Sequence, residues 1–175
     1  MSIGFFIHSH QAMLWRGPVA SNGLKQLINE TQWGELDYLI IDTPPGTGDI
    51  HLTLLQQYEV KGAIIVTTPQ KIAQDDVQKA ITMFRTEHVK IPVLGIVENM
   101  AWFTPAAHPG EKYFLFGRGG GQALSQFFNI PLLTQIPVTE NIVKTCDTGN
   151  LNELFNDKDV SEGFGKLTKM IVSLS

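Results

Sequence analysis

The segment "YLIIDTPPGTGDI", residues 38–50, is the most informative stretch of this chain. An apolar run ends at an aspartate, and two prolines and two glycines follow before a second aspartate. Proline fixes φ and glycine accepts backbone conformations that other residues avoid. The pattern therefore predicts a buried strand that stops abruptly, presents polar backbone to a ligand and leads into a helix.

Other short apolar runs along the chain predict further strands. They are rich in β-branched residues and continuous rather than alternating, which is typical of strands covered on both faces. With the opening segment, the predicted strands are residues 36–42, 62–68, 93–99 and 132–138, and 2–7 is a possible fifth.

Amphipathic stretches separate these runs and predict helices at residues 19–31, 71–88, 120–129 and 161–174. Alternating strands and helices indicate an α/β fold, with a three-layer, mainly parallel β-sheet flanked by helices. At 175 residues the chain fits a single domain spanning 1–175. The longest loops are expected at 104–112 and 148–159.

Composition narrows the class of protein. Lys and Arg number 13 and Asp and Glu 17, so the net charge of −4 suggests neither a nucleic-acid nor a membrane surface. A single cysteine rules out an internal disulfide and favours a reducing compartment. The first ten residues lack the features of a signal peptide, and we expect a cytoplasmic protein.

In parallel α/β folds ligands bind at the carboxyl ends of the strands, where Asp42 stands here. Its carboxylate could hold Mg²⁺ through water, since magnesium retains much of its hydration. Gly46 would let backbone N–H groups approach a phosphate, and Asp49 is expected to be the N-cap of the next helix. A plain strand–turn–helix junction explains these residues equally well.

A phosphate-binding loop of the form Gly-x-x-x-x-Gly-Lys-Ser/Thr should accompany such a site, and the sequence contains none. The run "GRGGG" (117–121) lacks the lysine, and "EGFGKLT" (162–168) has the wrong spacing. The first is better explained as a flexible turn before a helix.

Four segments together resemble the Mrp (ApbC) family of P-loop ATPases, which are related to MinD and ParA and implicated in carrying iron–sulfur clusters. The resemblance covers most of the chain and corresponds to the C-terminal part of the family's proteins, so it implies a P-loop NTPase-like fold truncated at its N-terminus. The segments are "WRGPVASNGLKQLINETQWGELDYLIIDTPPGTGDIHLTL", "GAIIVTTPQKIAQDDVQKAITMF", "VLGIVENMAWF" and "EKYFLFGRGGGQAL".

The resemblance implies ATP and Mg²⁺ as cofactors and assigns roles to particular residues. Asp42 would be the Walker B residue, catalytic and bound to Mg²⁺ through water. Asn99, Pro137 and Val138 would contact the adenine. The loop that senses the γ-phosphate would consist of Thr43, Pro44, Pro45, Gly46, Thr47, Gly48 and Asp49.

The chain departs from the family at a second place besides the phosphate loop. Many members carry Cys-x-x-Cys after the "ENM" strand, to bridge a cluster between two subunits, and this chain has "TPAAHP" (104–109) there. The expected partners are a second copy or the missing N-terminal portion, and apo iron–sulfur proteins by resemblance only. The iron–sulfur cluster itself is likewise implied by resemblance alone.

The remaining candidates are weaker. His108 alone is expected to be a solvent-facing loop residue, and Cys146 a buried free thiol on a helix. His8 and His10 lack a third metal ligand and are expected at an exposed strand end. The amphipathic end around Lys166 and Lys169 is expected to pack against the sheet.

Three functions remain open. The chain could supply half of the nucleotide site of an ATP-dependent iron–sulfur carrier, serve as a non-catalytic interaction module, or act as a positioning ATPase of the MinD/ParA type. Without the phosphate loop, the 175 residues alone are expected to hydrolyse ATP very slowly or not at all. An open sheet edge would also favour self-association or poor solubility.

Overall fold

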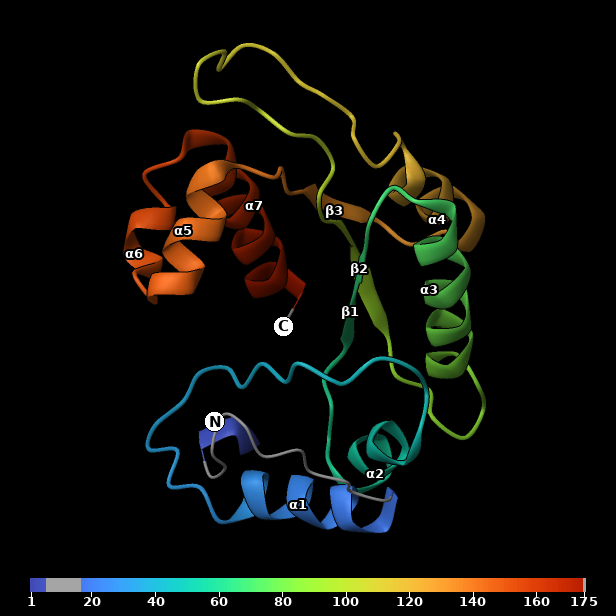
Figure 1. Cartoon of the computed structure of the whole chain (residues 1–175). Helices are drawn as coiled ribbons and strands as arrows, with labels where there is room; N and C mark the ends of the chain where they lie inside the picture. Colours follow the sequence, from blue (N-terminus) through green and yellow to red (C-terminus); the bar gives the residue numbers. More distant parts are fainter. Residues whose placement is uncertain (6–16, 175) are drawn as a thin grey trace. The chain divides into compact units, whose positions relative to one another are not determined.

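The computed structural model describes residues 1–5 and 17–174. It divides into two compact units, residues 1–60 and 61–175, and each is described by itself (Figure 1). Whether the chain behaves as the single domain expected from its length stays a prediction.

The first unit contains a 3₁₀ turn, η1 (Ile3–Phe5), and two helices, α1 (Gly17–Asn29) and α2 (Asp49–Gln57). The two helices pack together, and Leu54 and His51 of α2 are buried. A hydrogen bond of 3.0 Å from Thr53 Oγ1 to Ser21 Oγ joins the helices.

The predicted strand at residues 36–42 is wrong: this segment is an exposed, irregular stretch before α2. Its side chains face solvent, and Ile40 is 84% exposed. A strand exists only where a neighbour satisfies its backbone groups, and no described strand pairs with this one. The possible strand at 2–7 is not observed either, since residues 3–5 form η1 and the last two lie outside the described residues.

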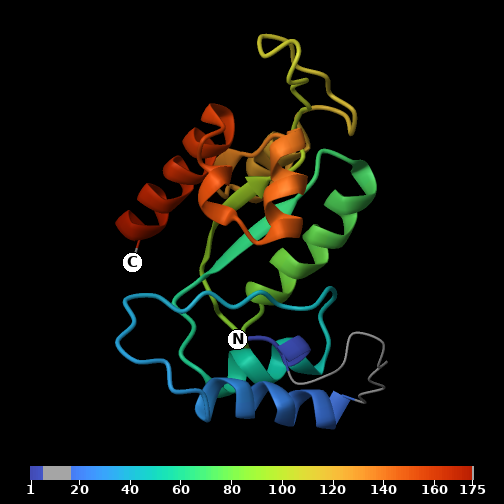
Figure 2. The same ribbon diagram turned by 60° about the vertical axis from the view of Figure 1, so that its left-hand side comes forward.

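The second unit confirms the predicted α/β fold. Its three described strands form a parallel sheet in the order β1-β2-β3, flanked by helices (Figures 1 and 2). The strands are β1 (Ala63–Thr67), β2 (Val93–Glu98) and β3 (Leu132–Gln135), and the helices are α3 (Lys71–Phe84), α4 (Gly120–Phe128), α5 (Glu140–Thr148), α6 (Leu151–Leu154) and α7 (Lys158–Leu174).

The sheet is the middle of three layers. Ile96 and Val97 are neighbours on β2 and therefore point to opposite faces, where each belongs to a separate apolar cluster. α3 and α4 cover the first face and α7 the second (Figure 2). The buried residues of the first cluster are Ile65, Ile81, Ile96, Leu124 and Ile130, and those of the second are Val97, Leu133 and Ile136.

The helix predicted at 161–174 is confirmed despite its two glycines. Gly163 lies where α7 approaches β3: an added Cβ would stand 2.8 Å from Ile136 Cδ1 and 3.3 Å from Gln135 O. The glycine permits the close contact of helix and sheet. The loop predicted at 148–159 is wrong, because α6 lies inside it and α5 and α7 extend into it.

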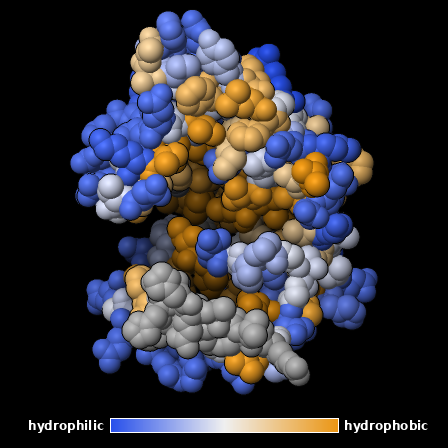
Figure 3. All heavy atoms as spheres, viewed as in Figure 1, coloured by the Kyte–Doolittle hydropathy of each residue, from blue (hydrophilic) through white to orange (hydrophobic). Residues whose placement is uncertain are grey.

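Apolar side chains also remain at the surface. Val66 on β1 is 58% exposed. Figure 3 shows apolar residues at the surface on the side of the molecule that it draws. Among the described residues, no helix combines the length and the hydropathy that crossing a bilayer requires.

Candidate nucleotide site

The segment from Asp42 to Asp49 is exposed throughout and ends at α2. Gly46 has φ of +95°, a conformation that favours glycine. The N-cap of α2 is Gly48, not Asp49 as predicted, and its carbonyl accepts from His51 N at 3.0 Å. Asp49 is instead the first helical residue, where its charge complements the positive end of the helix dipole.

The backbone of this segment is open to a ligand. From Thr43 to Gly48, no backbone N–H donates to another described residue. Asp42 is also exposed, and its carboxylate accepts no hydrogen bond from the described part of the chain. Free N–H groups beside a glycine turn can bind phosphate oxygens, and a free carboxylate can hold hydrated Mg²⁺.

In the second unit, the carboxyl ends of the three strands are joined by backbone hydrogen bonds. Asn99 N donates to Thr67 O at 2.7 Å, which links the end of β2 to β1. Ile136 N donates to Glu98 O at 2.9 Å, which links the end of β2 to the segment after β3. These bonds bring Asn99 close to the Pro137–Val138 segment.

The side-chain amide of Asn99 forms a hydrogen bond through its oxygen and keeps its nitrogen available for a ligand. Its Oδ1 accepts from Met100 N at 2.9 Å, and Met100 has a positive φ of 54°. Because an N–H must meet an oxygen, this bond fixes which end of the amide is which. The Nδ2 group has no hydrogen-bond partner among the described residues, so the amide caps the turn and still offers two donors.

Pro137 is fully buried and Val138 partly so. Val138 N donates to Trp102 O at 2.7 Å, so the chain after Asn99 runs beside the chain after β3. Phe103 pairs with both Val138 and Tyr113, and the predicted loop at 104–112 lies within this hairpin. The Lys112 ammonium lies 3.8 Å from the centre of the Trp102 ring. The segment beside Asn99 is thus held by backbone pairing on both sides.

Sequence reasoning missed Glu98, which is only 1% exposed at the end of β2. Its carboxylate accepts from Gly121 N and, at 2.6 Å, from Gln135 Nε2. The "GRGGG" run precedes α4 as predicted, and a Cβ at Gly120 or Gly121 would collide with Pro69 or Glu98. The signal available in the sequence was a glutamate at the end of one predicted strand followed, before the next predicted strand, by a glycine run at the start of a helix.

The other candidates make none of the contacts described above or fall outside the described residues. Cys146 is on a helix, α5, as expected, but it is exposed rather than buried. His108 is exposed, with Nδ1 3.9 Å from Glu111 Oε1. His8 and His10 fall outside the described residues, and the described part holds no cluster of three or more metal-ligating side chains. Leu167 and Met170 of α7 pack on the sheet, as expected for that segment.

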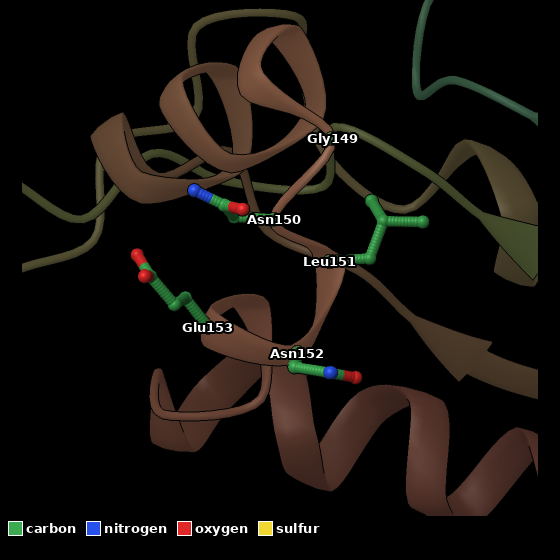
Figure 4. Close-up of a pocket in the computed structure, with 5 residues that line it drawn as sticks. All are labelled: Gly149, Asn150, Leu151, Asn152 and Glu153. Carbon is green, nitrogen blue, oxygen red and sulfur yellow. The ribbon is translucent and has the colours of Figure 1, made fainter.

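Two further features contain no predicted site residue. His51 is 6% exposed and its Nδ1 has no partner in the described part; burial lowers its pKa. A shallow pocket is lined by residues 149–153 at the junction of α5 and α6 (Figure 4). In the close-up, Asn150 lies on the connection that leads into α6 and Glu153 lies on α6 itself.

Known proteins resemble the chain along most of its length. The family model described as "NUBPL iron-transfer P-loop NTPase" (ParA) matches residues 1–172. The iron–sulfur cluster carrier protein of Rickettsia conorii is 49% identical over 84% of this chain and 42% of its own length. The carrier protein of Haemophilus influenzae is 46% identical, and the match covers 97% of this chain and 45% of that protein. The carrier protein of Aquifex aeolicus is 39% identical, and the match covers 98% of this chain and 47% of that protein.

Among solved structures, a nucleotide-binding protein from Archaeoglobus fulgidus in complex with ADP superimposes with a TM-score of 0.67. It is 42% identical, and the match covers 81% of this chain and 56% of that one. The chain thus spans about half the length of the relatives that it matches. On this evidence, the chain belongs to the ParA-type family of NUBPL iron-transfer P-loop NTPases.

Proposed function

We propose that this chain contributes the magnesium and adenine contacts of a nucleotide site in an iron–sulfur cluster carrier of the Mrp type. The observation that carries the proposal is the backbone pairing of the segment after Asn99 with the segment after β3, at the carboxyl ends of parallel strands: Ala101 N donates to Ile136 O and Val138 N donates to Trp102 O. Ligands of open α/β sheets bind at this edge. A protein 42% identical to this chain was solved with ADP.

The adenine contacts follow from what Asn99 offers. Its Nδ2 donors suit N1 of adenine, which accepts a hydrogen bond whereas N1 of guanine carries a hydrogen, and its Oδ1 is fixed by Met100 N at 2.9 Å. The backbone around Val138 is held by its bond to Trp102 O, so the edge opposite the amide is preorganised. Such a site binds a flat base with little loss of side-chain freedom.

The magnesium and γ-phosphate contacts are assigned to the exposed segment of the first unit. Asp42 would bind Mg²⁺ through water, and the backbone N–H groups of Thr43, Gly46, Thr47 and Gly48 would meet the terminal phosphate. The lysine-bearing loop that usually holds the β-phosphate has no counterpart in these 175 residues. We therefore expect weak nucleotide binding and very slow hydrolysis, unless another segment or chain supplies that loop.

The cargo and partners are proposed from the relatives, which are named as iron–sulfur cluster carrier proteins. Iron–sulfur clusters are held mostly by thiolates, and Cys146 is the only cysteine of this sequence. Further ligands of a cluster would come from outside these 175 residues, and its recipients would be apo iron–sulfur proteins. With one cysteine and no disulfide, a cytoplasmic location is the natural expectation.

A second candidate is a non-catalytic interaction module. The exposed apolar segment at residues 36–41 favours it, because Ile40 is 84% exposed and a partner strand could cover it. A positioning ATPase of the MinD/ParA type lacks a specific observation in this structure.

Equilibrium titration of the purified chain with ADP and Mg²⁺ tests the proposal. Asn99→Ala should weaken ADP binding with or without Mg²⁺, because it removes contacts to the base. Asp42→Ala should weaken it only when Mg²⁺ is present, because it removes a contact to the metal. Asp76→Ala is the matched control, because Asp76 is an exposed carboxylate on α3 whose partner in the described part of the chain is Lys79. No measurable ADP binding by the wild type, or equal effects of all three variants, would contradict the proposal.

A further inference from the structure

The buried carboxylate of Glu98 connects three elements of the second unit. Burying an ionised carboxylate is costly unless hydrogen bonds compensate for the lost water. Glu98 is 1% exposed, and its two oxygens accept from Gly121 N on α4 and from Gln135 Nε2 on β3. One side chain on β2 thereby fixes both neighbours.

The backbone of the same residue extends these links. Glu98 O accepts from Ile136 N at 2.9 Å, and Asn99 N, one residue on, donates to Thr67 O at 2.7 Å. Asn99 is directly bonded in sequence to Glu98, and Pro137 follows two residues after Gln135. Both sides of the proposed adenine site are therefore attached to groups that Glu98 holds.

The same geometry argues against a phosphate site at the glycine-rich start of α4. Helix N-termini attract anions, but Glu98 already accepts from Gly121 N at this one. A Cβ at Gly121 would stand 2.9 Å from Glu98 Cβ, so the helix start lies directly against the glutamate. A phosphate here would meet a buried negative charge, and the glycines serve to seat the carboxylate.

We propose that Glu98 is a positioning residue for the nucleotide base: its carboxylate fixes Asn99 relative to Pro137 and Val138. The inference rests on the proposed function, since it concerns the same adenine site. Glu98 does not touch the base. It acts by holding the end of β2 at a fixed distance from the segment after β3.

The test compares ADP and GDP binding to the wild-type chain and to Glu98→Gln, Glu98→Ala and Asn99→Ala. Glutamine has nearly the shape of glutamate but one acceptor oxygen, so it cannot satisfy both Gly121 N and Gln135 Nε2. If the base-competent arrangement falls to about a tenth of the population, the apparent Kd for ADP rises about tenfold. We expect that rise for Glu98→Ala, a smaller one for Glu98→Gln, and no change for the exposed control Glu87→Gln.

The ratio of the ADP and GDP dissociation constants separates positioning from simple destabilisation. A variant that only lowers the folded fraction weakens both nucleotides equally and leaves the ratio unchanged. Displacing Asn99 should bring the ratio toward one, as we also expect of Asn99→Ala itself. Circular dichroism checks folding, and if Glu98→Ala does not fold, the near-isosteric Glu98→Gln carries the test.

The outcomes distinguish this inference from the proposed function. A shift of the ratio in Glu98→Gln in the same direction as in Asn99→Ala supports the positioning role. A shift in Asn99→Ala with none in Glu98→Gln overturns that role and leaves the adenine site standing. A wild-type chain without any preference for ADP over GDP overturns the proposed function, and the positioning role with it.

Discussion

The two glycines of α7 provide a matched pair of substitutions for the packing of helix on sheet. In a helix interior, Gly→Ala gains about 1 kcal/mol because alanine loses less backbone entropy on folding. At Gly165 an added Cβ meets nothing within 4 Å, so Gly165→Ala should stabilise the chain by roughly that amount.

At Gly163 the same gain is opposed by a collision. The added Cβ would stand 2.8 Å from Ile136 Cδ1 and 3.3 Å from Gln135 O. The isoleucine end can rotate away, but the backbone carbonyl of β3 cannot move freely. Overpacking a core contact costs about 1–3 kcal/mol. The Gly163→Ala variant should therefore have a free energy of unfolding about 1–3 kcal/mol lower than the Gly165→Ala variant.

Urea unfolding followed by circular dichroism at constant m measures both variants. The double variant Gly163→Ala with Ile136→Val removes the nearer contact and should recover part of the loss, since the two positions touch. If Gly163→Ala is as stable as Gly165→Ala, α7 does not lie against β3 as closely as described.

Three further outcomes are expected. Leu133 is 0% exposed, so Leu133→Ala should lower the free energy of unfolding in urea by about 2–5 kcal/mol. Leu151 is 54% exposed, so Leu151→Ala should lower it by less than about 0.5 kcal/mol. Equal losses in the two variants would contradict the core assignment. Burial lowers the pKa of His51, so the unfolded chain binds protons more readily below pH 6.5 and stability should fall with acid. His51→Leu should remove that part of the pH dependence and His108→Leu should not; an unchanged profile in His51→Leu would refute the cause. The exposed thiol of Cys146 should react with Ellman's reagent in the native chain, and a reaction that requires denaturant would show that it is buried.

Local pattern predicted the elements whose partners lie within the second unit. The run at β2, "VLGIVE", is continuously apolar, and its last four residues are buried between two layers as such a pattern indicates. The run at 36–42 has the same character but is not a strand, because pairing depends on a neighbour that sequence pattern cannot supply. The apolar character of the two runs is alike, and only the run at β2 is paired with neighbouring strands in the part of the chain that the structure describes.

The candidate site divides in the same way. The rule that ligands bind at strand ends pointed to Asn99 and Pro137, and the structure brings these two segments together. Glu98 lies at the same strand end but received no role from the sequence, because a glutamate there ordinarily faces solvent and its burial depends on Gly121, 23 residues further along the chain. Cys146 was expected inside because Ile142 and Val143 are apolar neighbours, yet Thr145 faces inward there instead.

The central claim is that the strand-end segments of the second unit bind the base of an adenine nucleotide. Titration of the isotopically labelled chain with ADP and Mg²⁺, followed by NMR, tests it most directly. We expect saturable shifts of the Asn99 side-chain amide and of the Val138 and Met100 backbone amides, with the pocket at residues 149–153 unaffected. Saturable shifts confined to other residues, or none at all, would contradict it.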